Sequence, residues 1–250
     1  MRYLVAVPVF NEQHHVLRVL DAVARYCRDI LVIDDGSTDR TSALLARRPD
    51  VAVITHRENR GYGQSVIEAF HYAAYCDYDW VITMDCDEQH EPEQIPEFLE
   101  CMRCDAADVI SGSRYLRSFP DDDPAPPERR QINHTINLVL AQVLGLELTD
   151  SFCGFKAHRV EAMQRLALDE PGYAFPLQFW AQCVRAGMRV VEIPVRRIYR
   201  DRSRQFGGTL DDPAARLHHY LEVFVRELRR DAVAPAHETG LGVCCCTRSR

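Results

Sequence analysis

The feature that most constrains the fold is a regular alternation of short apolar runs with longer segments whose apolar residues recur every three or four positions. The short runs have the length of buried strands, and the longer segments have the periodicity of helices. We expect strands at 3–9, 30–33, 51–55, 80–84, 108–112 and 189–195. Strands that alternate with helices predict an α/β fold with a mostly parallel sheet and helices on both of its faces.

Several of the expected helices lie in the second half of the chain. The patterns are found at 129–145, 160–166, 175–186 and 213–230. Before them, the segment 116–128 is too rich in proline to form a helix or a central strand. A loop of this length is either a functional lid or a solvated surface insert, and the sequence leaves both interpretations open.

Short polar clusters follow four of the expected strands. They are Asn11-Glu12, Asp34-Asp35, the segment 59–63 and the segment 85–89. The carboxyl ends of parallel strands meet at one edge of a sheet, which is where ligands bind in folds of this kind. Because the clusters fall at equivalent strand ends, a single site explains them better than four coincidences.

The segment after the fourth expected strand has the composition of a cation site. Asp85, Asp87 and Gln89 alternate along the chain, so an extended backbone would direct their side chains to the same side. Oxygen ligands favour Mg²⁺, Mn²⁺ or Ca²⁺ over zinc or copper, and this set leaves coordination positions for phosphate oxygens. An Asp-x-Asp triplet also arises by chance in an acidic chain, so the surrounding motifs decide its meaning.

The glycine pattern argues against the common phosphate-binding loops. A dinucleotide-binding turn would follow the first strand, but Phe10, Asn11 and Glu12 stand there, and Val66 replaces the third glycine after Gly61 and Gly63. The sequence contains no GxxxxGK[ST] or GxSxG motif. We therefore expect phosphates to be held through a metal, while strand-end carboxylates bind a base or ribose, as in a nucleotide-sugar site.

Composition excludes some other functions. The chain of 250 residues has a net charge of −7, which argues against nonspecific nucleic-acid binding. No apolar run approaches the length of a membrane span, and the N-terminus begins a strand instead of a signal peptide. We expect a cytoplasmic protein, free or peripheral at the cytoplasmic face of the membrane. Five of its ten cysteines, namely Cys27, Cys76, Cys86, Cys153 and Cys183, are scattered through the expected strands, helices and turns, as free thiols would be.

We expect one catalytic domain over 1–231, with a nucleotide-binding half at 1–112 and an acceptor half at 113–231. Residues 232–250 have no periodicity, and we expect them to form a disordered tail. The arginine-rich segment 196–208 either clamps phosphate oxygens or forms a solvated strand end. The helix at 213–230 has a continuous apolar face. Most helices of this kind pack that face on their own domain, and the alternative is a helix that lies on a membrane surface.

The motifs, taken together and in order, resemble the inverting glycosyltransferase family 2. They lie at 7–12, 34–41, 59–63, 85–90 and 111–115. The closest likeness is to the dolichyl- or polyprenyl-phosphate mannosyltransferase branch, and it covers about 3–208. The resemblance implies a GT-A type, Rossmann-like α/β fold with a nucleotide-sugar site at the carboxyl ends of the strands. It also implies a hexosyltransferase activity that depends on Mg²⁺ or Mn²⁺.

The resemblance also implies roles for individual residues. Nucleotide-binding positions are Pro8, Phe10, Glu12, Asp35, Gly63 and Asp85. Metal ligands are Asp85, Asp87 and Gln89 of the DxD motif. Catalytic positions are Asp87, Arg114, Asp150, Arg200 and Arg204. The start of the helix at 129–137 would face the acceptor phosphate together with Arg114.

This chain departs from the family pattern mainly on the acceptor side. His134 stands where a second arginine is common, and Gln178 takes the place of a glutamate. The segment 150–156 resembles the family's Asp-x-x-Ser-Gly-Phe-Arg, with Cys153 for the serine and Lys156 for the arginine. The donor and metal motifs are nearly intact, so these differences concern the identity of the acceptor.

Three functions fit these residues. The first is transfer of a sugar, most directly mannose from GDP-mannose, to a polyprenyl or dolichyl phosphate, whose oxygen needs no general base. The second is transfer from UDP-glucose or a similar donor to a hydroxyl, for which Asp150 would be the base. The third is metal-dependent nucleotide binding without turnover. A lipid acceptor would imply a peripheral membrane contact or a membrane partner subunit, and no function implies nucleic acid.

Overall fold

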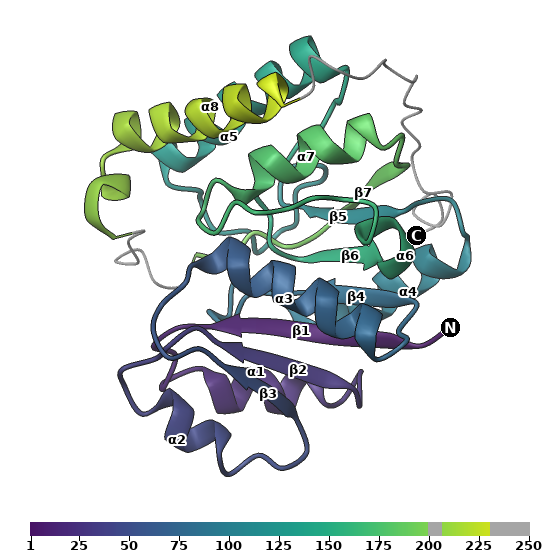
Figure 1. Ribbon diagram of the computed structural model, residues 1–250, viewed down its shortest axis with the longest axis vertical. Helices are drawn as coiled ribbons and strands as arrows, with labels where there is room; N and C mark the ends of the chain where they lie inside the picture. Colours follow the sequence, from purple (N-terminus) through teal and green to yellow (C-terminus); the bar gives the residue numbers. More distant parts are fainter. Residues whose placement is uncertain (200–206, 231–250) are drawn as a thin grey trace.

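One seven-stranded sheet runs through the described part of the chain, residues 1–199 and 207–230 of this computed structural model (Figure 1). The strands are β1 (Tyr3–Val9), β2 (Ile30–Asp34), β3 (Ala52–Thr55), β4 (Trp80–Thr83), β5 (Val109–Ser113), β6 (Lys156–Arg159) and β7 (Val190–Pro194). Their order is β3-β2-β1-β4-β6-β5-β7, and only β6 runs antiparallel to its neighbours. The expected mostly parallel α/β architecture is confirmed.

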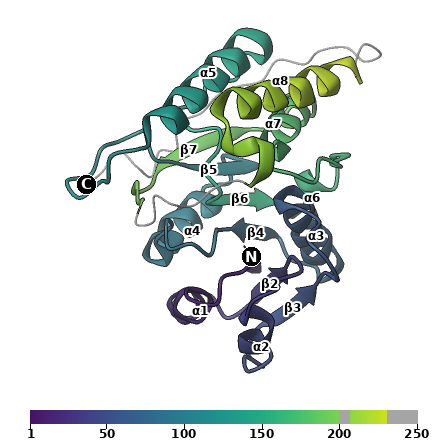
Figure 2. The same cartoon turned by 90° about the vertical axis from the view of Figure 1, so that its left-hand side faces the viewer.

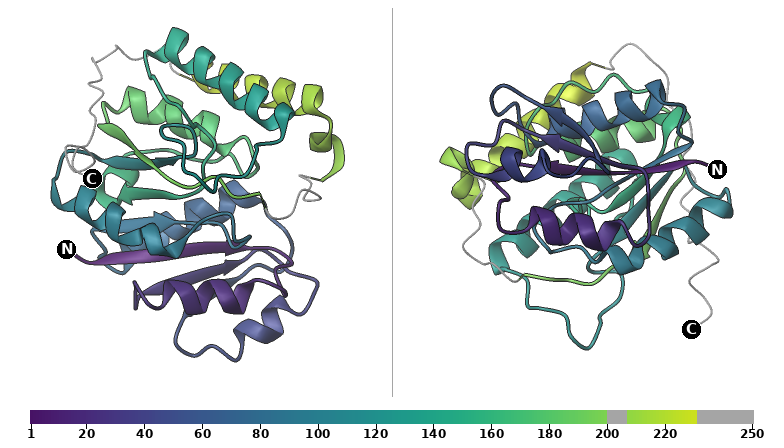
Figure 3. Two further views of the ribbon diagram at one scale, coloured as in Figure 1. Left: turned by 180° about the vertical axis from the view of Figure 1, so that it is seen from behind. Right: turned by 90° about the horizontal axis from the view of Figure 1, so that it is seen from below.

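Helices cover both faces of the sheet, as Figures 2 and 3 show from other sides. The helices are α1 (Val16–Val23), α2 (Thr41–Leu45), α3 (Tyr62–Tyr75), α4 (Ile95–Arg103), α5 (Pro127–Leu144), α6 (Val160–Met163), α7 (Phe175–Arg185) and α8 (Pro213–Arg229). Short 3-10 turns precede α4 at Pro92–Gln94 and α8 at Gly208–Asp211. Apolar residues of α3 and α5 to α8 form one core, and those of α1, α2 and α4 form the other.

Burial along the strands follows their place in the sheet. Every residue of β2, β4 and β5 is buried, because helices cover both sides of these strands. The edge strand β3 alternates between half-buried and exposed residues, so only one of its faces packs on the core. The continuous apolar runs in the sequence therefore mark the strands that lie inside the sheet.

Strand β6 was missed by the sequence analysis. Its sequence, Lys-Ala-His-Arg, contains no apolar run, yet Lys156 and His158 are buried in the sheet between β4 and β5. The register pairs Thr83 with Lys156, so the beginning of β6 lies at the same edge as the end of β4. This reversed strand therefore brings the loop before it to the carboxyl ends of its neighbours.

Helix α8 uses its apolar face within the domain. Tyr220, Val223 and Phe224 are buried in the core shared with α7, and α5 lies alongside (Figures 1 and 2). The expectation that this helix packs its apolar face on its own domain is confirmed, and the alternative that this face lies on a membrane surface is wrong. Among the described residues, no helix has both the length and the apolar character needed to cross a membrane.

Other expectations have mixed outcomes. The described cysteines are free, as predicted. The segment Leu116 to Pro126 is a loop up to the start of α5, and its role as a lid stays a prediction. The expected tail at 232–250 lies outside the described residues, and the division of the catalytic domain into two halves also stays a prediction.

Candidate active site

A cavity of about 740 Å³ lies at the edge of the sheet where the parallel strands end. Most of the residues singled out in the sequence line it: Pro8, Phe10, Glu12, Asp35, Asp85, Asp87, Gln89 and Arg114. Gly63 and Asp150 do not. Arg200 and Arg204 lie outside the described residues. The structure therefore brings the strand-end clusters together in one site, as the parallel sheet predicts.

Asn11 ties the first strand-end cluster to the second. Its backbone is in the left-handed region, with a φ of 58°. Its side-chain oxygen accepts hydrogen bonds from the backbone N–H groups of Thr38 (2.8 Å) and Asp39 (3.2 Å). In return, its own N–H donates to Ser37 Oγ at 3.0 Å. These bonds fix the loops after β1 and β2 to each other, next to the cavity wall that Glu12 and Asp35 form.

Asp35 is held in place by the turn that begins α3. Its Oδ1 accepts a hydrogen bond from the backbone N–H of Arg60 (2.7 Å), and its Oδ2 accepts one from Gly61 (2.9 Å). Gly61 has a φ of 101°, and a Cβ there would lie 2.3 Å from the carbonyl oxygen of Pro171. The turn at 59–63 therefore orients a carboxylate and does not cradle phosphate in the manner of a dinucleotide loop.

Gly63 has a packing role instead of the predicted nucleotide contact. A Cβ at this position would lie 2.2 Å from the carbonyl oxygen of Glu170 and 2.8 Å from Phe175 Cβ. Glycine is needed because the first turn of α3 touches the backbone just before α7. Gly63 does not line the cavity, and its nucleotide-binding role stays a prediction.

The cation segment does not keep the extended geometry expected for it. The strand ends at Thr83, Glu88 has a φ of 59°, and the N–H of Gln89 donates to Asp87 Oδ1 at 3.1 Å. Asp85, Asp87 and Gln89 nevertheless all line the cavity. A turn, and not strand alternation, brings these oxygen atoms to the same space.

Two neighbours set the position of the Asp85 carboxylate. The backbone N–H of Asp85 donates to His90 Nδ1 at 3.1 Å, which leaves the ring proton on Nε2, 3.8 Å from Asp85 Oδ2. Burial lowers the pKa of His90 to about 4, so the ring is neutral. From the other side, a Cβ on Gly154 would lie 2.4 Å from Asp85 Oδ2. Glycine is therefore needed at position 154, because a side chain there would collide with the Asp85 carboxylate.

The residues present suit a hard divalent cation. The described residues contain no cluster of three or more His, Cys, Asp or Glu side chains arranged around one point. Asp85, Asp87 and Gln89 instead offer carboxylate and amide oxygens at the cavity wall. A Mg²⁺ or Mn²⁺ ion would take the rest of its ligands from water and substrate, as these ions do when they bind phosphates.

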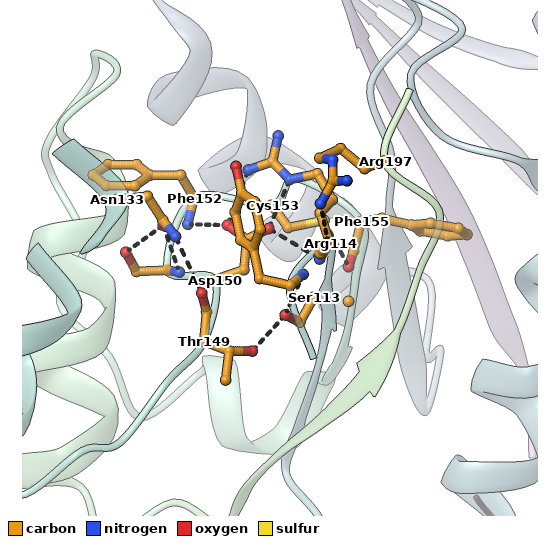
Figure 4. Close-up of polar contacts among 12 residues, drawn as sticks. Ser113, Arg114, Asn133, Thr149, Asp150, Phe152, Cys153, Phe155 and Arg197 are labelled. Atoms are coloured by element: carbon orange, nitrogen blue, oxygen red, sulfur yellow. Dashed lines mark hydrogen bonds and ion pairs between the residues drawn. The ribbon is translucent and has the colours of Figure 1, made fainter. Parts of the chain in front are cut away.

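At the other end of the cavity, Arg114 is paired with Asp150 (Figure 4). Arg114 Nε donates to Asp150 Oδ2 at 2.6 Å and its terminal nitrogen to Oδ1 at 2.9 Å. Burial favours the neutral carboxyl, but the Arg114 charge outweighs it and the pKa of Asp150 is lowered. Asp150 is fully buried and ionised behind Arg114. It therefore orients Arg114 and does not line the cavity, and its role as a general base stays a prediction.

Two further acceptor-side residues are placed away from the cavity. His134 is exposed on α5, and Gln178 is buried between α7 and α8. Gln178 Nε2 donates to Asp169 (2.7 Å) and Glu227 (2.9 Å), so its amide joins two acidic side chains. Neither side chain lines the cavity, and their influence on the choice of acceptor stays a prediction.

Several lining residues were not found in the sequence. They are mainly aromatic or basic: Phe152, His158, Tyr173, Phe175, Phe179, Arg216 and Tyr220, whereas Tyr62 and Arg129 belong to segments that the sequence had singled out. Most belong to α7 and α8 or to the loops before them, where apolar periodicity also predicts core residues. The one available signal was that Phe152 stands inside the Asp150–Lys156 motif.

Comparison with known proteins places these motifs in a family. A family model described as glycosyl transferase family 2 matches residues 4–167. The undecaprenyl-phosphate mannosyltransferase of Micrococcus luteus is 32% identical over 227 residues, which cover 85% of this chain and 90% of that protein. The polyprenol monophosphomannose synthase of Mycolicibacterium smegmatis is 30% identical over 204 residues, covering 78% of this chain and 76% of the relative.

A solved structure supports the fold. The glucosyl-3-phosphoglycerate synthase of Mycobacterium tuberculosis, crystallised with Mn²⁺, UDP and glucosyl-3-phosphoglycerate, superposes with a TM-score of 0.67. It covers 96% of this chain and 88% of its own, at 16% identity. Likeness at that identity concerns the fold alone, and it confirms the expected GT-A arrangement.

Proposed function

The chain belongs to glycosyltransferase family 2, and we propose that it transfers mannose from GDP-mannose to a polyprenyl phosphate. The family membership makes the chain a glycosyltransferase, and relatives similar over most of its length are named for polyprenyl-phosphate mannose transfer. The donor, the metal and the acceptor are the proposed part.

The observation that carries the proposal is that acidic and basic lining residues of one cavity come from different parts of the sheet, which we call its two ends. Glu12, Asp35, Asp85 and Asp87 line one end. At the other end the lining includes arginines and aromatic rings, namely Arg114, Arg129, Phe152, Arg216 and Tyr220. An acidic end suits ribose hydroxyls and a metal-bound diphosphate, and a cationic, aromatic end suits a phosphate that carries an apolar chain.

The metal would be held by Asp85, Asp87 and Gln89. When bound, Mg²⁺ or Mn²⁺ neutralises charge on the diphosphate and on the leaving group. Pro8, Phe10, Glu12 and Asp35 would bind the nucleoside, since these residues form the cavity wall beside the carboxylates. His90 and Gly154 keep the Asp85 carboxylate in one position.

An anionic acceptor agrees with the chemistry of the opposite end. A hydroxyl acceptor needs a general base, and Asp150 is buried and paired with Arg114. A phosphate oxygen is already ionised, and Arg114 and Arg129 lie on the lining to receive it. The phosphate oxygen would form a bond to the anomeric carbon as the bond to the nucleoside diphosphate breaks, with inversion, and the diphosphate would leave with the electron pair.

Arg200 and Arg204, which lie outside the described residues, would assist the departing diphosphate. A polyprenyl acceptor would also require the protein to meet a membrane surface or a membrane partner subunit. Both points belong to the proposal and follow from the chemistry of the substrates.

Transfer of label from GDP-[¹⁴C]mannose to polyprenyl phosphate with Mn²⁺, followed by chloroform extraction, tests the proposal. We expect extractable product with the wild type and none when EDTA replaces Mn²⁺. Product from UDP-glucose and none from GDP-mannose would show that the proposed donor is wrong. A water-soluble product would show that the acceptor is not a polyprenyl phosphate. Tight nucleotide binding without any product would contradict the enzymatic role.

A further inference from the structure

A chain of ionisable side chains runs from the cavity wall to the surface, with Asp35 and His56 buried, Glu68 half-buried and Arg60 exposed. His56 follows β3 and is 7% exposed. Its Nδ1 lies 2.6 Å from Asp35 Oδ1, and its Nε2 lies 2.7 Å from Glu68 Oε2 on α3. The other oxygen of Glu68 accepts a hydrogen bond from Arg60 at 2.7 Å. His56 therefore bridges the lining residue Asp35 to Glu68 of α3, which does not line the cavity.

Both ring nitrogens of His56 face ionisable carboxylates at hydrogen-bond distance. A neutral imidazole carries one proton, so one nitrogen would direct a lone pair at a carboxylate oxygen less than 3 Å away. An imidazolium donates from both nitrogens and satisfies both acceptors. With His56 protonated, the charges of Asp35, Glu68, His56 and Arg60 sum to zero, whereas a neutral ring leaves the buried Asp35 carboxylate without a cation beside it.

The pKa shifts of His56 and Glu68 agree with this assignment. Burial acts to lower the pKa of His56, but the hydrogen bonds to Glu68 and Asp35 outweigh it, and the net shift is upward from 6.5. For Glu68, burial acts to raise the pKa, and the hydrogen bond from His56 reverses this, so the net shift is downward. The shifts of this pair are those of an ion pair that exists in the folded state.

The charged groups around His56 come from every element packed against its ring. Asp35 comes from the end of β2, Glu68 comes from α3, and Arg60 reaches Glu68 from the turn before α3. The backbone N–H of His56 donates to the carbonyl of Asp34 at 2.8 Å, which fixes the ring next to the loop after β2. Asp35 also receives the N–H groups of Arg60 and Gly61, so His56 completes the set of donors that hold this carboxylate.

We infer that His56 is a positioning residue for the donor nucleotide, which binds well only while the imidazolium bridges Asp35 and Glu68. Loss of the proton removes one donor and places a lone pair against a carboxylate. Either Glu68 or Asp35 must then move, and Asp35 is the one that lines the cavity. This inference rests on the proposed nucleotide site and extends it by coupling donor affinity to one histidine proton.

The sign of the pH dependence follows from the raised pKa. The stabilising contribution of the bridge is fully present below the unfolded value near 6.5 and is lost as the pH rises through the higher folded value. Donor affinity therefore falls on the alkaline side of that value, by up to roughly tenfold per pH unit, since one proton is involved. Turnover of bound donor stays nearly constant, because His56 does not line the cavity.

The decisive experiment measures the Kd of GDP and of UDP with Mn²⁺ by calorimetry between pH 6 and 9, for the wild type, Glu68→Gln and His56→Asn. We expect the wild-type affinity to fall with rising pH. In Glu68→Gln the midpoint of that fall should move to lower pH, because one carboxylate no longer favours the imidazolium. In His56→Asn the affinity should be weaker than in the acidic wild type and should lack this pH step. Superimposable pH curves for the three proteins would overturn the inference.

A spectroscopic measurement separates this inference from the proposed function. In ¹⁵N-labelled wild type at pH 7, both ring nitrogens of His56 should have the chemical shifts of protonated imidazolium, with the resonance assigned by its absence in His56→Asn. A deprotonated nitrogen at that pH would refute the bridge. If neither nucleotide binds at any pH while the ring is doubly protonated, the proposed nucleotide site fails and the histidine assignment stands.

Discussion

The two ends of the cavity are built in different ways. At the donor end, lining residues come from the loops that follow β1, β2 and β4, so the parallel sheet places them at one edge. At the acceptor end, only Arg114 follows a strand, β5, and the other lining residues come from α5, α8 and the loop before the reversed strand β6. The donor end depends on strand register, and the acceptor end depends on how helices and loops pack.

This difference explains where variation is tolerated. A motif residue at a strand end reaches the cavity whenever the strand forms. A motif residue on the acceptor side lines the cavity only if the packing of neighbouring helices and loops exposes it there. Asp150 and Gln178 are instead buried, where they bond to Arg114 and Glu227. Substitutions at each end should therefore affect stability and activity differently.

The largest effect is expected where the acceptor end carries a buried charge pair. Arg114→Met removes the partner of a fully buried carboxylate and should lower the free energy of unfolding by about 3–5 kcal/mol. Urea denaturation of the purified variant measures it. The double variant Arg114→Met/Asp150→Leu should recover part of the loss, since no unpaired charge remains. A loss below about 1 kcal/mol for the single variant would mean that the pair is not buried as described.

At the donor end we expect a loss of activity without a comparable loss of stability. Asp87→Asn should reduce kcat/KM for sugar transfer roughly 100-fold, about 2.7 kcal/mol, because a metal ligand loses its charge. Glu88→Gln is the matched control: this adjacent carboxylate contacts Arg18 at 3.1 Å and does not line the cavity. Equal activity of the two variants in the presence of Mn²⁺ would show that Asp87 is not a ligand.

Gln178→Glu tests whether a family position on the acceptor side acts on the site. It would place a third carboxylate against Asp169 and Glu227, so we expect the unfolding free energy to fall by about 1–3 kcal/mol while the KM values for donor and acceptor stay within twofold. Gln131→Glu, on the exposed side of α5, controls for the added charge. A tenfold change in acceptor KM would show that position 178 affects acceptor binding, which would contradict this expectation.

The smallest effect is expected at His134. The residue is exposed on α5 and does not line the cavity, so His134→Ala should change the unfolding free energy by less than about 0.5 kcal/mol. Steady-state kinetics with varied polyprenyl phosphate should be unchanged. A selective rise in acceptor KM, with donor KM constant, would place the acceptor path along the outer side of α5.

The sequence predicted the donor end well because its signals are local. An apolar run followed by carboxylates predicts both the end of a strand and the side chains at that edge of the sheet, as at Asp34-Asp35 and Asp85. It failed at β6, where Lys156 and His158 are buried polar residues with no apolar run to reveal a strand. It also could not tell that Asp150 faces Arg114 and not the cavity, because that depends on contacts between distant segments.

The proposed function requires that the strand-end carboxylates bind a nucleoside diphosphate through a divalent cation. Thermal unfolding of the wild type and Asp85→Asn, each with GDP or UDP and with or without Mn²⁺, tests it most directly. A ligand at 100 times its Kd stabilises the folded state by about 2.7 kcal/mol, so we expect the wild-type Tm to rise by roughly 5–10 °C with one nucleotide plus Mn²⁺. Either component alone, or Asp85→Asn with both, should give little change. An equal rise without Mn²⁺, or in Asp85→Asn, would contradict the claim.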